Sequence, residues 1–451
     1  MKIDLLVAEI GSTTTIVNAF SGLMGEDPQW LGQGQAATSV EAGDVSIGLE
    51  AAIEELRKKL GASELSWEEM LASSSAAGGL KMTVHGLVYD MTVRAAREAC
   101  LGSGAVIHHV SAGKLRRGDL KRITEVAPKL IYLAGGTDYG EYETALYNAE
   151  VLMDHFPDIP LIYAGNISNV EEIKEMAEEK DVKIYLTENV YPALDQLNIE
   201  PSRQLIHQAF EENIVHSSGM EKIRDLVNGP ILPTPGAVME AAILLQKELG
   251  DLLVMDIGGA TTDLHSVTAG DPAKEDLLVQ AEPFAKRSVE GDLGVYVNRK
   301  QLFKQFTEEE QKHLGSLAER FLLQGGEIPS SEEEILFVQV LAQRAAERAF
   351  ERHAGQWREH FTGEGMKRLI EGKDLTAVRH VIGTGGALTR LPLGKVILER
   401  ALAKAPPKAL YPAKEVAIHL DNDYLMASLG VLAKTYPKAA LKLLKKSLRW
   451  E

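Results

Sequence analysis

The sequence of 451 residues contains a single cysteine, Cys100. One cysteine excludes an intrachain disulfide, and it also excludes metal and iron–sulfur sites that need several cysteines from one chain. A chain that makes no use of disulfides is typical of a reducing compartment. The sequence therefore predicts a cytoplasmic protein.

Long apolar runs are also absent. At the N-terminus, Asp4 and Glu9 interrupt the apolar stretch that a secretory signal would need. Elsewhere no segment approaches the roughly 20 uncharged apolar residues of a membrane-spanning helix. We therefore expect a soluble protein, and a membrane is not an expected partner.

Basic residues are in deficit. The chain has 48 Lys and Arg against 65 Asp and Glu, which gives a formal net charge of −17. A nucleic-acid backbone is bound by clustered positive charge, so nucleic acid is not an expected partner. A nucleotide is not excluded, because loop amides and helix N-termini hold phosphates without basic side chains.

A motif near the N-terminus is repeated later in the chain. Residues 5–15, LLVAEIGSTTT, align with residues 252–262, LLVMDIGGATT, at a constant offset of 247, and seven of the eleven pairs are identical. Each copy is a short apolar run, a carboxylate and a turn of small residues. An apolar run that ends in glycine indicates a buried strand. Two copies this far apart indicate two related halves of one fold.

Both turns have the composition of a phosphate site. Glycine lets the backbone approach an anion, loop amides and hydroxyls donate to phosphate oxygens, and a carboxylate can hold a hydrated Mg²⁺. Two such hairpins facing one another would clamp the terminal phosphates of a nucleotide and its metal. The alternative is two structural hairpins in a duplicated fold. The candidate residues are Glu9, Gly11, Ser12, Thr13 and Thr14 in the first turn, and Asp256, Gly258, Gly259, Thr261 and Thr262 in the second.

A third motif, Gly383-Thr384-Gly385-Gly386, follows an apolar strand. Paired glycines after a strand allow close approach to a nucleotide base or ribose. A left-handed turn into a helix explains the same pattern, so both interpretations stay open at this point.

Strands and helices alternate along the rest of the chain, which predicts an α/β protein with largely parallel sheets. Apolar runs indicate strands at 83–88, 130–134, 161–164, 182–186 and 381–382. Helical patterns occur at 48–60, 141–153, 170–179, 201–212, 237–249, 332–352 and 393–404, and the whole of 307–360 is expected to be helical.

These patterns predict two lobes and an insertion. Residues 1–75 would form the first lobe, completed by the helical region at about 421–451; residues 76–228 would form an inserted α/β region, and 229–420 the second lobe. The C-terminal helix is basic and has an apolar stripe. It would dock on an acidic partner or a membrane, or pack on the body of the protein.

The order of the three motifs resembles the actin/sugar kinase/heat-shock-70 ATPase superfamily. The resemblance implies an actin-like fold, a duplicated ribonuclease H-like arrangement, with ATP and Mg²⁺ between two lobes. Glu9 and Asp256 would order the hydrated metal and the attacking water, where the family usually has Asp at the first position. A glycine–acid loop with Glu290 and Asp292 recurs in such ATPases and is assigned to the nucleotide. Contacts to adenosine are assigned to Gly383, Gly385 and Gly386.

A narrower resemblance covers nearly the whole chain. Its segments are similar to the glutamate mutase accessory family, called GlmL or MutL, which is unrelated to the mismatch-repair protein of that name. This resemblance implies an ATP-dependent chaperone whose partner is an adenosylcobalamin-dependent mutase of amino-acid fermentation, from which it releases damaged cobalamin. A homodimer stays open. The segments that carry the resemblance are 73–82, 133–138, 164–166, 188–192 and 230–238.

Other functions of the same superfamily remain as alternatives. The second turn is compatible with a small-molecule kinase and with an ATP-dependent hydantoinase, and a filament-forming actin-like protein is a third possibility. An activator of 2-hydroxyacyl-CoA dehydratases is disfavoured, because such proteins share a cluster that uses two cysteines per subunit, and this chain has only Cys100.

Overall fold

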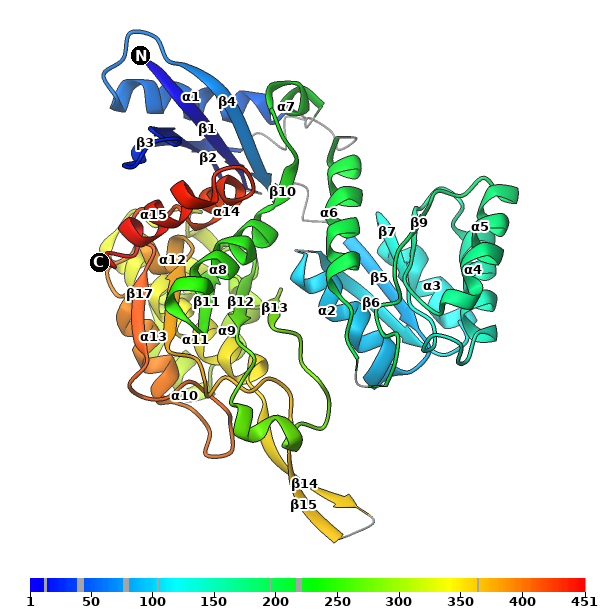
Figure 1. The fold of residues 1–451 in the computed structure, drawn as a ribbon. Helices are drawn as coiled ribbons and strands as arrows, with labels where there is room; N and C mark the ends of the chain where they lie inside the picture. The colour runs from blue at the N-terminus through cyan, green and yellow to red at the C-terminus, as the bar shows by residue number, and fades with distance from the viewer. Residues whose placement is uncertain are drawn as a thin grey trace.

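The structure is a computed structural model. It describes residues 1–11, 14–38, 44–75, 81–103, 105–194, 196–215, 221–362 and 365–450. Two candidate phosphate residues, Ser12 and Thr13, and residues 76–80 of a family segment lie outside the described residues. Figure 1 shows two α/β lobes one above the other, with a third α/β region beside them.

The first lobe is built on a five-stranded sheet in the order β10-β4-β1-β2-β3. Strands β1, β2 and β3 are antiparallel neighbours, while β4 and β10 run parallel to β1. Helix α1 (Ser46–Lys59) packs against β2 and β3. The strands are β1 (Lys2–Ile10), β2 (Thr14–Ser21), β3 (Gln29–Ala37), β4 (Ser66–Ser74) and β10 (Ile231–Pro233).

The second lobe repeats this arrangement in the order β13-β12-β11-β16-β17. Again three strands are antiparallel neighbours and two run parallel to the first of them. When the strands of each sheet are counted along the chain, both sheets have the spatial order third, second, first, fourth, fifth; for the first sheet this is β3-β2-β1-β4-β10. The shared order confirms the duplicated, actin-like fold that the sequence predicts. The strands are β11 (Leu252–Ile257), β12 (Thr262–Val267), β13 (Ala285–Glu290), β16 (His380–Thr384) and β17 (Ala417–Leu420).

The register of the two central hairpins is also the same. Ile10 lies opposite Thr15 in the first hairpin, and Ile257 lies opposite Thr262 in the second. The offset is 247 on both strands, as in the sequence repeat. The repeat therefore corresponds to two hairpins with the same pairing.

A separate parallel sheet lies between the two halves in sequence, in the order β6-β5-β7-β8-β9. Its strands are β5 (Lys81–Gly86), β6 (Val106–Ala112), β7 (Leu130–Leu133), β8 (Leu161–Tyr163) and β9 (Ile184–Leu186). Its helices are η3 (Tyr89–Val93), α2 (Arg94–Gly102), α3 (Arg117–Val126), α4 (Glu143–His155), η4 (Ile167–Asn169), α5 (Val170–Glu179) and α6 (Glu200–Val215). Helix α7 (Glu221–Leu226) lies beside the first lobe in Figure 1, where Lys222 pairs with Asp44.

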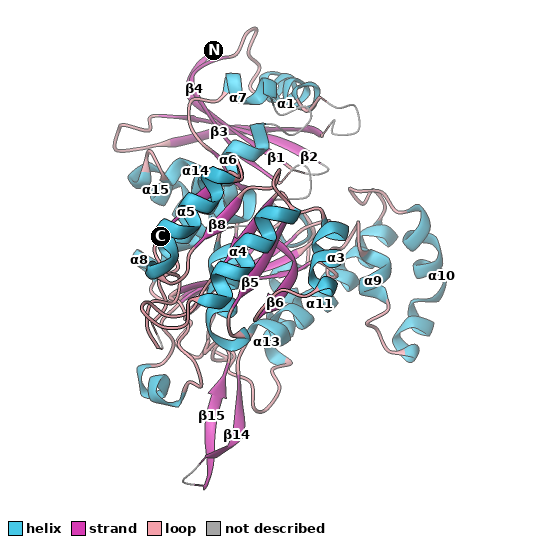
Figure 2. Ribbon diagram, turned by 90° about the vertical axis from the view of Figure 1, so that its right-hand side faces the viewer, coloured by secondary structure: helices cyan, strands magenta, loops and turns pink. Residues whose placement is uncertain are grey.

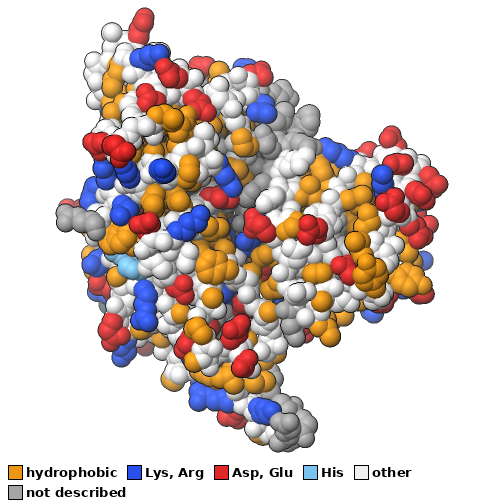
Figure 3. Space-filling model, viewed as in Figure 1, with side chains coloured by type: hydrophobic (Ala, Val, Ile, Leu, Met, Phe, Trp, Pro, Cys, Tyr) orange, Lys and Arg blue, Asp and Glu red, His pale blue; other side chains and the backbone are white. Residues whose placement is uncertain are grey.

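The outer surface of this inserted sheet region is acidic. Red side chains gather at its outer edge in Figure 3, where α5 lies, and the exposed glutamates there include Glu171, Glu175 and Glu178. Like charges at this density disfavour the approach of a polyanion.

Helices α8 (Thr234–Leu249) and α14 (Met426–Ala433) connect the two lobes. They pack on each other, α8 contacts strands of both sheets, and α14 contacts β1 and β4. A shared apolar core contains Leu5 and Phe20 of the first sheet together with Val254 and Ile382 of the second. Figure 1 shows these helices between the two sheets.

The C-terminal helix α15 (Pro437–Ser447) packs on the body of the protein. Leu443 and Leu444 of its apolar stripe are buried in the shared core. Its cations pair with acids of the body, such as Lys446 with Asp27 at 2.7 Å. The stripe is therefore not free for a membrane or a partner. None of the helices in the described part of the chain combines the length and the apolar character that a bilayer crossing needs.

Two features of the fold differ from the sequence expectations. Strand β10 takes the fifth place in the first sheet, although its residues belong to the predicted second lobe. The segment 307–360 holds two helices separated by a loop at 325–331, and the second helix ends at His353. An extended hairpin follows and projects from the body in Figure 2. The remaining elements are η5 (Pro272–Leu277), α9 (Arg299–Phe303), α10 (Glu308–Gln324), α11 (Glu332–His353), β14 (Gln356–Thr362), β15 (Gly365–Glu371), α12 (Gly386–Thr389) and α13 (Gly394–Ala403).

The close contact between the connecting helices predicts a stability effect. A Cβ on Gly430 of α14 would lie 1.8 Å from the carbonyl oxygen of Ala237 in α8, so the helices would have to separate. We expect Gly430→Ala to lower the free energy of unfolding by about 1–3 kcal/mol in urea titrations. Gly118→Ala in α3 is the control, because its Cβ meets nothing within 4 Å. An unchanged unfolding midpoint for Gly430→Ala would contradict the packing of α8 on α14.

Candidate functional site

The two repeated turns close with the same hydrogen bond. The amide of Gly11 donates to the carbonyl of Thr14 at 3.0 Å, and the amide of Gly258 donates to the carbonyl of Thr261 at 2.9 Å. The carboxylate just before each turn faces a hydroxyl residue on the neighbouring parallel strand: Glu9 pairs with Ser73 and Asp256 with Thr384. Duplication has therefore placed two carboxylates at corresponding points of the two sheets.

These two carboxylates share one electrostatic environment. Burial is the main cause, and the negative charges of Asp256 and Asp421 are further causes, that together raise the pKa of Glu9 to about 8. Burial likewise raises the pKa of Asp256 to about 7, with Asp263 and Asp421 raising it and Arg287 lowering it. The two turns therefore face each other closely enough for their charges to interact.

Asp421 is a functional candidate that the sequence reasoning missed. It is buried directly after β17, and its carboxylate accepts hydrogen bonds from Thr384 Oγ1 at 3.0 Å and Ser447 Oγ at 2.6 Å. The amides of Leu425 and Met426 at the start of α14 also donate to it, each at 2.9 Å. The available signal was a third carboxylate at the end of a short apolar strand, as at Glu9 and Asp256.

Tyr424 lies beside the same group of acids. Burial first, and then the charges of Glu9, Asp256 and Asp421, raise the pKa of its hydroxyl well above the ordinary value. The guanidinium of Arg390 lies 5.4 Å from the centre of its ring. Arg390 also donates to the side chain of Gln33 in β3, so this cation joins the second lobe to the first.

The three predicted adenosine glycines have different surroundings. A Cβ on Gly383 would lie 2.8 Å from the side chain of Leu398, so this position is fixed by core packing. Gly385 has a φ of +84°, and a Cβ there would lie 2.3 Å from Oδ1 of Asp256. Gly386 begins α12 and meets nothing within 4 Å. The structure therefore brings Gly385 against the second turn and leaves space beside Gly386.

The threonines of the second turn also differ. Thr261 donates from its hydroxyl to Asp263 at 3.0 Å. Thr262 is fully buried, and its hydroxyl donates to the carbonyl of Leu293 at 2.9 Å. Gly259 accepts through its carbonyl from the amide of Tyr296 at 2.9 Å. Thr262 therefore stabilises the turn from its buried side. Thr261 is half-buried, as Thr14 is at the corresponding position of the first turn.

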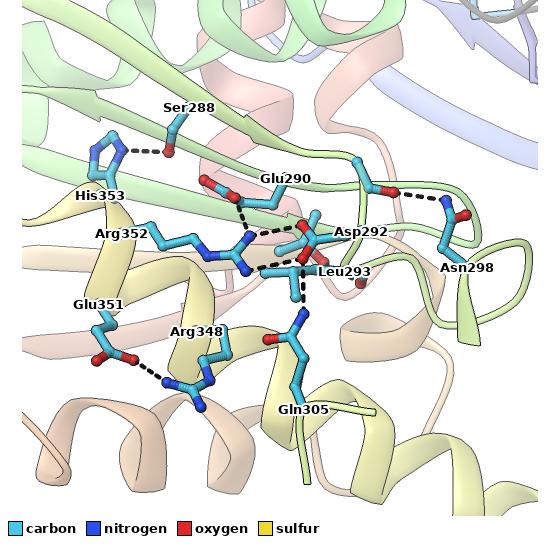
Figure 4. A network of polar contacts seen from close by, with 12 residues as sticks. Ser288, Glu290, Asp292, Leu293, Asn298, Gln305, Arg348, Glu351, Arg352 and His353 are labelled. Atoms are coloured by element: carbon cyan, nitrogen blue, oxygen red, sulfur yellow. Dashed lines mark hydrogen bonds and ion pairs between the residues drawn. The ribbon is translucent and has the colours of Figure 1, made fainter. Parts of the chain in front are cut away.

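Glu290 and Asp292 both pair with Arg352 of α11, as Figure 4 shows. Arg352 contacts Glu290 at 2.6 Å and holds both oxygens of Asp292, at 2.7 and 2.9 Å. Arg352 lowers the pKa of Asp292, whereas burial outweighs the same cation and raises the pKa of Glu290. Asn298 ties this loop to the second turn by donating to the carbonyls of Gly291 and Ala260. Arg352 lies 60 residues from Asp292 in the chain, so no local pattern pointed to this pairing.

This arrangement suits a hydrated divalent cation. Oxygen donors are the ligands that Mg²⁺ prefers, and Mg²⁺ usually keeps several of its waters. Repulsion from Asp256 raises the proton affinity of Glu9, and a cation between the two carboxylates would relieve this repulsion. Among the described residues, no three acidic or histidine side chains lie close enough to hold a metal directly. Mg²⁺ does not need such a group, because one or two carboxylates can bind it while it keeps several waters.

Comparison with known proteins identifies the family. A family model described as "MutL protein" matches residues 5–448. The chain is also 36% identical over 465 residues to Protein MutL of Clostridium tetanomorphum, and the match covers 98% of each chain. This chain belongs to the MutL family. The narrower resemblance seen in the sequence is thereby confirmed.

Two solved structures resemble this MutL family member loosely. A diol dehydratase-reactivating factor in nucleotide-free form is 12% identical with a TM-score of 0.35, covering 97% of this chain and all of that one. A nucleotide-free acetone carboxylase is 13% identical with a TM-score of 0.36, covering 96% of this chain and 70% of that one. The fold is assigned from the matching strand order of the two sheets.

The raised pKa values predict how the metal-free protein responds to pH. Glu9 and Asp256 keep protons in the folded state that the unfolded chain has lost, so folding is favoured below about pH 5 and loses this contribution as pH rises toward 8. Each retained proton makes the free energy of unfolding fall by about 1.4 kcal/mol per pH unit. The Glu9→Gln variant lacks one of these retained protons. We therefore expect its free energy of unfolding to fall less steeply with pH, by about 1.4 kcal/mol per pH unit.

The measurement is urea unfolding at several pH values between about 5 and 8 in the presence of a chelator. Glu171→Gln, on the exposed face of α5, is the control for loss of one carboxylate. Equal slopes for the wild type and Glu9→Gln would contradict the shared acidic environment.

The position of Gly385 predicts a local distortion. A methyl group at this position would displace the carboxylate of Asp256 and would also require a left-handed backbone. We expect Gly385→Ala to lower the free energy of unfolding by about 1–3 kcal/mol, whereas Gly386→Ala, in open space, should change it by less than about 1 kcal/mol. Equal thermal unfolding of the two variants would refute the close approach of this loop to the second turn.

Proposed function

We propose that this chain is an ATP-dependent accessory protein that reactivates an adenosylcobalamin-dependent amino-acid mutase, of the glutamate mutase or aminomutase type. The observation that carries the proposal is the pair of matched turns, which have the same closing hydrogen bond and bring Glu9 and Asp256 into one environment. Membership of the MutL family supports the choice of partner. The site of action would be the cytoplasm.

In this proposal the phosphates of ATP lie between the two turns. Backbone amides would donate to them at Ser12 and Thr13 in the first turn and at Gly259 in the second. The amides of Gly11 and Gly258 close the two turns, so these glycines would contribute by letting the phosphates approach the backbone. Hydroxyls at Thr14 and Thr261 would add donors, whereas Thr262 would act by holding the turn in shape. Donors fixed in advance stabilise charge in phosphoryl transfer with little reorganisation.

Mg²⁺ would neutralise the phosphate charge and lower the barrier to hydrolysis. Glu9 and Asp256 would orient its waters and the attacking water. Gly385 and Gly386 would lie against adenosine, and Gly383 would support this loop from the core. Glu290 and Asp292 both pair with Arg352, so they would stabilise the loop next to the second turn. They would not contact the nucleotide as unpaired carboxylates.

The proposed output is a change in the relative position of the lobes. The shared core around α8 and α14 joins the sheets, and the Arg390–Gln33 contact crosses between them. Release of phosphate after hydrolysis removes charge from a site that both lobes would contact, so it would alter how tightly they close. Such a movement would loosen the partner mutase and allow damaged cobalamin to leave.

The first test concerns the site. We expect Asp256→Asn to lower ATP hydrolysis by about 100-fold or more, as loss of one group that stabilises a transition state does. Asp271→Asn is the matched control, because Asp271 pairs with Lys274 on η5, outside both turns. Hydrolysis by Asp256→Asn at the wild-type rate would overturn the site assignment.

The second test concerns the partner. Candidate mutases would be inactivated with a cobalamin analogue and then incubated with this protein, ATP and Mg²⁺ in excess intact cofactor. We expect activity to return for one mutase with the wild type and not with Asp256→Asn. Failure to reactivate any mutase would refute the proposed partner class. Transfer of phosphate from ATP to a small molecule without a protein partner would instead establish a kinase.

A further inference from the structure

Arg287 joins the second turn to the inserted region. It lies in β13, and its side chain is buried to 99%. One terminal nitrogen of its guanidinium donates to Oδ1 of Asp263 at 2.8 Å, and the other donates to the carbonyl of Leu101 at 3.0 Å. Asp263 follows the second turn, while Leu101 belongs to the last turn of α2 in the inserted region. One planar side chain therefore contacts both.

The contact continues into the turn. The second oxygen of Asp263 accepts the hydroxyl of Thr261 at 3.0 Å, so the path runs from Thr261 through Asp263 and Arg287 to α2. A cation at the C-terminal end of a helix is favoured by the exposed carbonyls and the helix dipole. A buried arginine with one carboxylate partner is sensitive to any further charge that enters its surroundings.

Other arginines at this interface do not reach the turn. Arg94 of α2 contacts Gln280 and Glu282, and Arg203 of α6 donates to the carbonyl of Ala285. These contacts attach the inserted region to the loop before β13 and to the first residue of that strand. Of the three arginines, Arg287 is the one that contacts Asp263. A change at the second turn can therefore reach Arg287 through Asp263, whereas Arg94 and Arg203 stabilise the interface.

We propose that Arg287 is a positioning residue that couples phosphate binding at the second turn to the docking of α2. This inference rests on the proposed function, since it assumes that a nucleotide phosphate occupies that turn. When the phosphate takes the hydroxyl of Thr261, Asp263 keeps Arg287 as its partner. The added negative charge draws the guanidinium toward the turn and away from Leu101. The docking of α2 then loosens, and the coupling acts in both directions.

The test is amide hydrogen exchange of peptides from α2, with and without a non-hydrolysable ATP analogue and Mg²⁺. Exchange reports local opening of a helix. In the wild type we expect the analogue to speed exchange in α2 by at least about fivefold, the lower end of typical coupling between sites. Peptides of α4, in the same inserted region, provide an internal reference.

Two variants separate coupling from folding. Arg287→Lys keeps the charge but lacks the planar fork that spans Asp263 and Leu101, so it should bind the analogue while the exchange ratio in α2 falls to about 1. Arg94→Gln, on the same helix, should keep the wild-type ratio, because Arg94 has no contact with the turn. Thermal unfolding and calorimetric titration establish that each variant is folded and binds the analogue.

The outcomes are distinguishable from failure of the proposed function. If the wild type binds no ATP analogue in the titration, the proposed function itself fails. If it binds the analogue but α2 exchange is unchanged or slowed, or if Arg287→Lys keeps the fivefold effect, the coupling role of Arg287 is overturned.

Discussion

The mutual repulsion of Glu9, Asp256 and Asp421 is the constraint on which the rest of the site depends. Burial at the junction of the lobes removes water that would screen these charges, and the pKa values of Glu9 and Asp256 rise as a result. Such a cluster is costly unless a proton or a cation compensates it. A fold that keeps it therefore needs strong local support, which the two hairpins, the capped start of α14 and the shared core supply.

That support is duplicated, and the duplication explains much of the geometry. The two hairpins have the same register and the same closing hydrogen bond at an offset of 247 residues. The parallel strand beside each hairpin places a hydroxyl residue opposite the carboxylate. The halves differ in their contacts with other parts of the chain. In the second half, Asp263 contacts Arg287, which also contacts the inserted region. In the first half, the corresponding strand β2 contacts α14 through the hydrogen bond between Asn18 and Ser428.

Much of the fold was predictable because its signals are local. The apolar strands before glycine turns, the helix at 170–179 and the repeated motif all depend on residues close in sequence, and they match the structure. The hairpin at 356–371 was missed because its charged residues show no clear alternation next to a long helix. The fifth strand of the first sheet was missed because it has three residues and is defined by its pairing with β4.

The site was predictable in part for the same reason. Glu9, Asp256 and the glycines stand out in the sequence, but a side chain's direction and partner depend on distant residues. Thr262 has the right residue type for a phosphate site, yet its hydroxyl faces the carbonyl of Leu293. Arg352, which neutralises Asp292, and Asp421, which is fixed by Ser447, gain their roles only through tertiary contacts. Composition and spacing identify candidate residues, and packing decides which of them face the site.

The most direct measurement of the central claim is calorimetric titration of the purified chain with ATP, in Mg²⁺ and in a chelator. The account predicts one ATP bound per chain, with affinity that depends on Mg²⁺ because the acidic cluster repels phosphate without a cation between them. No binding, or binding of equal strength with and without Mg²⁺, would contradict the assignment of a nucleotide–metal site to the paired turns.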